Sequence, residues 1–89
     1  MKISISGGNG FIGKLIFNNF LDYEIVNINR KNIFIPNHTN MVIHLAGIAH
    51  DMSSKFSYED YMIGNYKLTK DIFKEFLNSD ASTFLFFST

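Results

Sequence analysis

With 89 residues, the chain has room for one small domain. Eight basic and eight acidic residues cancel, without a basic run, which argues against a nucleic-acid or membrane-surface partner. The sequence contains no cysteine, which excludes disulfides, thiolate metal sites and thiol catalysis. Because neither a signal peptide nor an apolar stretch of transmembrane length is recognisable, we expect a soluble, cytoplasmic domain.

The N-terminal part of the chain predicts a strand, a glycine-rich turn and a helix. Residues 1–5 alternate and contain β-branched side chains, as in a short strand. Apolar residues then recur on one face of a helix expected over residues 11–21. These residues are Ile12, Leu15, Ile16 and Phe20. Glycines therefore stand where the strand must turn sharply into the helix.

The spacing of these glycines, G-x-x-G-x-x-G, predicts a binding site for the pyrophosphate of a dinucleotide. Gly7 would permit the tight turn, Gly10 would let the backbone approach a phosphate, and Gly13 would let the helix pack on the strand. The free N–H groups of the first helical turn, which includes Phe11 and Ile12, would point at the anion.

Two other interpretations use the same residues. Gly8 to Lys14 has the G-x-x-x-x-G-K spacing of a nucleoside-triphosphate loop, but Leu15 follows where that loop needs a hydroxyl to bind magnesium. A turn without any ligand would explain one or two glycines but not three at regular spacing. The pattern therefore favours the dinucleotide site.

The end of the second strand, expected over residues 23–29, bears on the choice of cofactor. In dinucleotide-binding units an acidic residue about 20 positions beyond the glycines holds the adenosine ribose, whereas arginine there suits a 2′-phosphate. Asn29 takes this position here, and Arg30 and Lys31 follow. Two interpretations stay open: recognition of the 2′-phosphate of NADP(H) by Arg30, or two solvated charges at a strand end.

The remaining elements predict a parallel α/β sheet. Residues 41–47 form an apolar run typical of a central parallel strand, a helix is expected over residues 57–77, and residues 83–87 form the last strand. About ten residues precede the central strand and reach roughly 33 Å, too little for a further strand with its crossover helix. We therefore expect one domain, residues 1–89, with part of a Rossmann-type fold. Helices cover both faces of its sheet, the first strand lies between the second strand and the central one, and the third βα unit is reduced or absent.

The three histidines do not predict a metal site, because His38, His44 and His50 lack helical i,i+4 spacing and an acidic partner. We interpret His44 as a polar residue whose hydrogen bonds are satisfied within the sheet. Gly64 lies inside the expected long helix, where it costs up to ~1 kcal/mol relative to alanine. Its presence predicts close packing or a bend there.

Tyr66 and Lys70 spell Tyr-x-x-x-Lys, which sets both side chains one helical turn apart on the same face. A lysine in this position could lower the pKa of a tyrosine and make it a base. We prefer the simpler interpretation, an aromatic residue and a solvated lysine on a packed helix.

Several of these stretches together resemble the extended short-chain dehydrogenases, the NAD-dependent epimerase/dehydratase family. The resemblance rests on the three glycines, on the stretches His44-Leu45-Ala46-Gly47 and Phe86-Phe87-Ser88-Thr89, and on Asn65. It covers essentially the whole chain, but only the first part of such an enzyme. The residues around the central strand and the long helix are most similar to nucleotide-sugar epimerases and reductases of surface-polysaccharide pathways.

The resemblance implies an NAD(P) cofactor, with a leaning to NADP(H) because of Arg30. The backbone of Leu45, Ala46 and Gly47 would line this cofactor, Asn65 would lie on the helix that follows, and Thr89 would assist catalysis. The catalytic Tyr-x-x-x-Lys of the family would lie beyond residue 89. The resemblance thus implies the cofactor half of an epimerase, dehydratase or reductase acting on a nucleotide sugar. The alternative is a non-catalytic module that binds NAD(P) or senses its redox state.

The last strand also predicts self-association. Residues 83–87 are apolar on both faces and carry no lysine, proline or other protection of a sheet edge. Short, uncharged, β-prone segments of this kind aggregate when exposed. We therefore expect residues 1–89 alone to be marginally stable, and to form a homodimer or aggregate unless a partner covers this strand.

Overall fold

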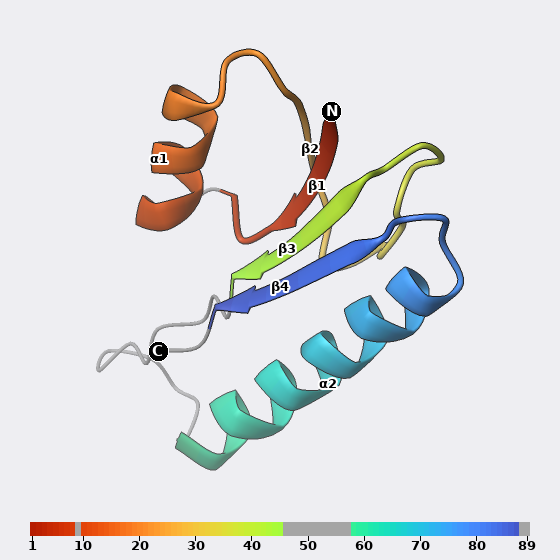
Figure 1. Cartoon of the computed structure of the whole chain (residues 1–89). Coiled ribbons are helices and arrows are strands. Elements are labelled where there is room, and N and C mark those ends of the chain that lie inside the picture. Colours follow the sequence, from red (N-terminus) through yellow and green to blue (C-terminus); the bar gives the residue numbers. More distant parts are fainter. Residues whose placement is uncertain (9, 46–57, 88–89) are drawn as a thin grey trace.

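The computed structural model describes residues 1–8, 10–45 and 58–87, which form a parallel four-stranded sheet with two helices (Figure 1). The elements in chain order are β1 (Lys2–Ser6), α1 (Phe11–Asn19), β2 (Glu24–Asn27), β3 (Met41–Leu45), α2 (Tyr58–Leu77) and β4 (Thr83–Phe87). Each strand that the sequence predicted is present, with its ends moved by two residues or fewer where they are described. The chain is therefore an α/β protein.

The strand order is β2-β1-β3-β4, and all three neighbouring pairs are parallel. This is the order expected from the sequence. Ile3 stands opposite both Ile25 of β2 and Met41 of β3, which places β1 at the centre of the sheet. Because the strands are parallel, β1, β3 and β4 end at the same edge of the sheet as the glycine turn.

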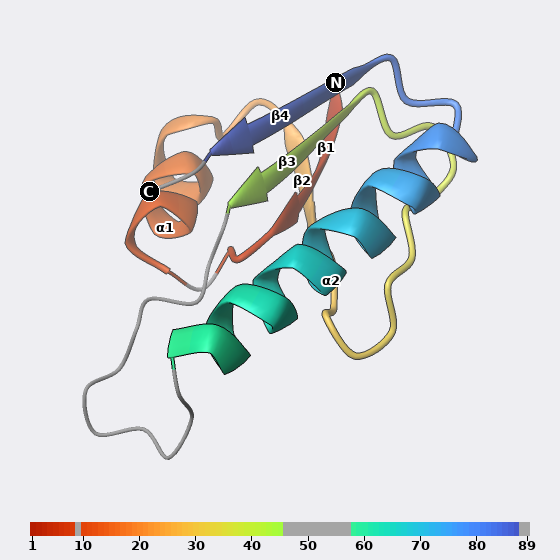
Figure 2. The ribbon, with the colours of Figure 1, turned by 90° about the horizontal axis from the view of Figure 1, so that it is seen from below.

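The alternation along the strands divides the core into two clusters on opposite faces of the sheet. One cluster packs against α1 and consists of Ile3, Ile5, Ile43 and Leu45. The other consists of Ile28, Ile35, Val42 and Ile72, the last of which comes from α2. The sheet thus lies between the two helices (Figure 2).

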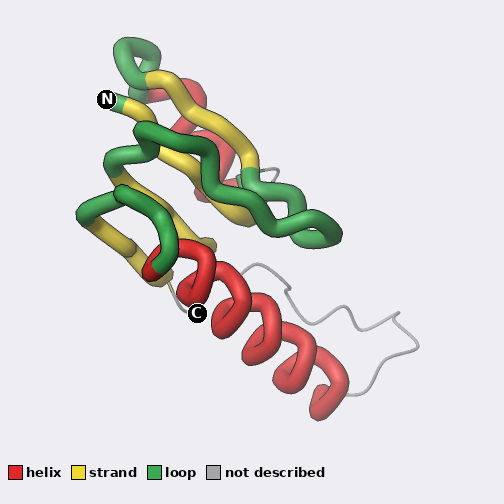
Figure 3. Tube along the Cα trace, turned by 90° about the vertical axis from the view of Figure 1, so that its right-hand side faces the viewer, coloured by secondary structure: helices red, strands yellow, loops and turns green. Residues whose placement is uncertain are grey.

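The connection over residues 28–40 replaces a regular βα unit. It contains only an isolated bridge between Asn29 and Asn32, yet it buries Ile28 and Ile35 on the α2 face of the sheet. Figure 3 shows this connection running beside α2. The Thr39 side chain ties it to β1, with Oγ1 lying 2.9 Å from the Ser4 Oγ. An irregular segment therefore covers sheet surface that would otherwise be open.

The packing of α1 differs from the predicted apolar face. Ile16 and Phe17 contact the core, whereas Ile12, Leu15 and Phe20 remain nearly half exposed. The reason is the rotation of the helix, because the buried Gly13 faces inward and residues three and four positions later share its face. Among the described residues, no helix is both long and apolar enough to cross a membrane.

Candidate functional site

Gly7 makes the turn at the carboxyl end of β1. Its φ of 77° is in the left-handed region, which favours glycine, and a Cβ there would lie 3.1 Å from both the Cβ and the carbonyl oxygen of Leu45. The turn thus passes closely over the end of β3. Gly7 and Leu45, two of the residues expected at a cofactor, are brought together by this contact.

The start of α1 is packed against the same turn. A Cβ on Gly13 would lie 2.5 Å from both the Cα and the carbonyl oxygen of Gly8. A Cβ on Gly8 would in turn overlap the side-chain oxygen of Asn27 in β2. Gly13 meets backbone atoms, so its packing requires glycine, whereas a side chain on Gly8 would displace the end of the Asn27 side chain. No role at the dinucleotide site was predicted for Gly8, because it lies outside the G-x-x-G-x-x-G spacing.

Gly10 differs from these glycines because no contact with the described residues requires a glycine there. Its φ of −81° and ψ of −178° suit any residue. Of the described atoms outside its chain neighbours, a Cβ there would meet only the Gly7 carbonyl oxygen within 4 Å, at 3.5 Å. The missing side chain leaves open space directly before the first turn of α1.

The first turn of α1 presents hydrogen-bond donors beside this space. Gly10 is the N-cap of the helix and provides no side-chain cap, while its own N–H donates to the Gly7 carbonyl. The N–H groups of Phe11 and Ile12 have no acceptor within the helix, since such bonds begin one turn later. Backbone donors and the positive end of the helix dipole together suit an anion.

A buried polar chain lies beneath the turn, on the α2 face of the sheet. His44 in β3 bonds through Nδ1 to the Ser6 hydroxyl of β1, and its Nε2 lies 2.8 Å from the Thr69 Oγ1 of α2. A neutral imidazole has one donor and one acceptor, and each hydroxyl can serve as either. His44 is therefore satisfied within the fold, as expected, and it joins the two central strands to α2.

Burial lowers the pKa of His44 below its ordinary value near 6.5, and the positive charge of Arg30 lowers it further. The unfolded chain consequently binds this proton at a higher pH than the folded chain does. The neutral form of His44 therefore stabilises the folded chain fully above about pH 6.5. This stabilisation of the fold is lost as the pH falls from there toward the lowered pKa of His44.

We therefore expect the free energy of unfolding to decrease below pH 6.5, with a slope of up to ~1.4 kcal/mol per pH unit from this residue. Urea titrations at pH values between 7.5 and 5 measure this slope. The His44→Gln variant should lose it, while His38→Asn, which replaces an exposed histidine at a positive φ of 67°, should keep it. An identical slope in parent and His44→Gln chains would contradict this assignment.

Asn65 lies one turn before Thr69 on α2, and its side-chain oxygen is buried without a hydrogen-bond partner among the described residues. A buried acceptor without a partner costs about 1–3 kcal/mol, so it marks a place where a ligand donor would be favourable. Ala46, Gly47 and Thr89, the other residues assigned through the family resemblance, lie outside the described residues.

Arg30 is exposed and lies on the α2 face, where it lines a groove with Lys31 and with residues of α2. The structure therefore does not bring it into the glycine turn.

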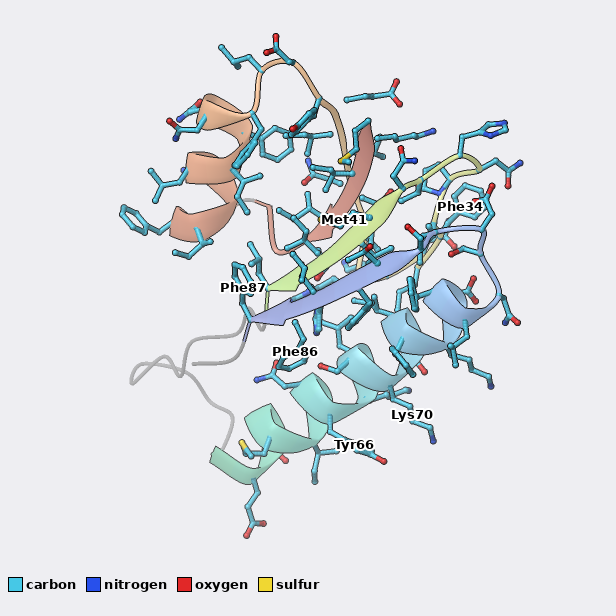
Figure 4. The ribbon with its side chains drawn as sticks, viewed as in Figure 1. Phe34, Met41, Tyr66, Lys70, Phe86 and Phe87 are labelled. Carbon is cyan, nitrogen blue, oxygen red and sulfur yellow. The ribbon has the colours of Figure 1, made fainter. Side chains whose placement is uncertain are left out.

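Three residues of α2, Tyr66, Lys70 and Gly64, are exposed. Tyr66 and Lys70 point away from the sheet (Figure 4), which agrees with the expected solvated lysine. Gly64 is not closely packed, because a Cβ there would meet no described atom within 4 Å. In the described ranges, no group of three or more His, Asp or Glu side chains lies close enough together to hold a metal ion.

Comparison of the chain with protein-family models, with curated proteins and with solved structures found no match.

Proposed function

We propose that the chain binds a nicotinamide dinucleotide at the turn between β1 and α1. The observation that carries this proposal is the open space beside Gly10, directly before the first turn of α1. Gly7, Gly8 and Gly13 are explained by the backbone and by contacts within the chain, whereas no described contact explains Gly10. The space that it leaves open adjoins the first-turn N–H groups of α1, where the pyrophosphate of a dinucleotide would bind.

The residues around the turn fit such a cofactor. Phe11, Ile12 and Gly13 would hold the pyrophosphate through their N–H groups. The buried oxygen of Asn65 would accept a hydrogen bond from a hydroxyl or amide group of the ligand. The bound nicotinamide would supply hydride transfer, and the role of the protein is to bind and orient it.

We further propose that the described sheet is the first part of a Rossmann-type domain with a reduced third βα unit, belonging to a nucleotide-sugar epimerase, dehydratase or reductase. The parallel sheet, its strand order and the irregular connection over residues 28–40 support this interpretation. The resemblance of the glycine turn, Leu45 and Asn65 to the epimerase/dehydratase family supports the reaction class. Binding without turnover by any longer natural form would favour the non-catalytic module instead.

Arg30 is expected to favour NADP(H) over NAD(H), because its guanidinium can form a charge-assisted hydrogen bond with the 2′-phosphate. Since Arg30 is exposed, solvent reduces this contribution to about 1 kcal/mol. Arg30→Ala should therefore weaken NADPH binding roughly fivefold and leave NADH binding unchanged, as measured by calorimetric titration. The Lys70→Ala variant, which removes an exposed cation of α2, should bind both cofactors like the parent. Equal affinity of the parent for NADPH and NADH would contradict the role of Arg30.

A further inference from the structure

A groove of about 660 Å³ lies between α2 and the connection that follows β2. Its volume falls within the range typical of small-molecule sites, about 300–1,000 Å³. The connection contributes Arg30, Lys31 and Ile33, and the other wall is one side of α2. These two segments run side by side on the same face of the sheet (Figure 3).

The two walls differ in charge. Arg30 and Lys31 make the wall formed by the connection positive, with no acidic residue on it. The α2 wall is balanced, because its two lysines face the groove together with two acids. These residues are Lys67, Asp71, Lys74 and Glu75. An anionic group in the groove would therefore lie against the connection, while the Asp71 and Glu75 carboxylates of α2 can accept hydrogen bonds.

Gly64 keeps the groove open on the α2 side. It lies inside a 20-residue helix, where alanine forms helix better than glycine, and a Cβ there would meet no described atom within 4 Å. No described contact within the chain explains the glycine. Because Gly64 lines the groove, any larger side chain at this position would reduce the space available to a ligand.

We propose that this groove binds a phosphorylated sugar. The phosphate binds Arg30 and Lys31, the hydroxyl groups donate to Asp71 and Glu75, and the carbon skeleton lies over Ile33. The groove lies apart from the proposed pyrophosphate site, because none of the glycines of the β1–α1 turn lines it, but it shares Arg30 with the proposed contact to the 2′-phosphate of NADP(H). Binding here therefore does not depend on Gly10.

The test is a titration of the ¹⁵N-labelled chain with ribose 5-phosphate, followed by NMR, with ribose as the matched compound without a phosphate. We expect saturable shifts of the backbone signals of Arg30, Lys31 and Gly64 with ribose 5-phosphate, and none with ribose. Gly64→Leu should weaken binding at least tenfold without unfolding the chain, because leucine is a good helix former. The double variant Arg30→Ala/Lys31→Ala should weaken it similarly.

Two control variants test whether binding of ribose 5-phosphate depends on the groove residues alone. Lys70→Ala removes an α2 cation that does not line the groove, and Gly10→Val alters the turn before α1. Both variants should bind ribose 5-phosphate like the parent. The proposal is overturned if the parent shows no saturable shift, if Gly64→Leu binds as well as the parent, or if Gly10→Val abolishes binding. Loss of NADPH binding in Gly10→Val with retained ribose 5-phosphate binding would support the separate groove site.

Discussion

Replacing Gly10 with valine is expected to reduce NADPH affinity at least a hundredfold, which corresponds to about 2.7 kcal/mol. The valine side chain would occupy the space before the first turn of α1 and would keep a pyrophosphate away from the N–H groups of that turn. The fold should tolerate the change, because among the described atoms a Cβ at this position meets only the Gly7 carbonyl oxygen, at 3.5 Å. Calorimetric titration and thermal melts of the same samples measure both effects.

Two further variants show whether the effect belongs to the ligand or to the fold. Gly13→Val should destabilise the chain by several kcal/mol, since a Cβ there lies 2.5 Å from the Gly8 backbone. Asn18→Val adds the same side chain to an exposed position of α1 and should change neither binding nor stability much. The pyrophosphate assignment would be wrong if Gly10→Val bound NADPH as tightly as the parent.

The sequence predicted the strands well because each has a strong local signal. The apolar run at the start of β3 and the uncharged residues of β4 admit few other structures, and the observed spans match the predicted ones closely. The strand order followed from the length of chain available between β2 and β3. A segment of about ten residues can return along the sheet, but it cannot form another strand with its own crossover helix.

Side-chain packing and hydrogen bonding were harder to predict, because they depend on rotations and on contacts between distant residues. The inward face of α1 is set by Gly13 packing on Gly8, which a pattern of apolar residues does not reveal. The partners of His44 come from β1 and α2, 38 and 25 residues away along the chain. The alternation of isoleucine and serine in β1 does indicate an apolar and a polar face. Ser6 lies on the polar face, where it bonds to His44.

The same limit applies to the groove beside α2. Arg30 and Lys31 have no helical or strand periodicity that would relate them to α2, so only the folded connection brings them opposite that helix. Gly64, a poor helix residue, was expected to mark close packing or a bend, and the close packing is not found among the described residues.

A polypeptide of residues 1–89 is expected to associate through β4. This strand pairs with β3 on one side and has no neighbouring strand on the other among the described residues. Its side chains are apolar on both faces of the sheet, and Leu85, Phe86 and Phe87 are between 38% and 46% exposed. Phe86 and Phe87 lie near the end of the strand in Figure 4. Antiparallel pairing of β4 with β4 of a second copy would satisfy its free backbone groups and cover these side chains.

Phe87→Lys should shift the chain toward the monomer, because a lysine on an edge strand opposes pairing with another copy. The matched control is Phe34→Lys, which removes a more exposed aromatic side chain, 62% accessible, from the connection between β2 and β3. This control should associate like the parent if the edge, rather than exposed apolar surface in general, drives association. Light scattering and thermal melts over a range of concentrations measure both properties. A parent chain that stays monomeric, with a concentration-independent melt above about 50 °C, would show that β4 needs no partner.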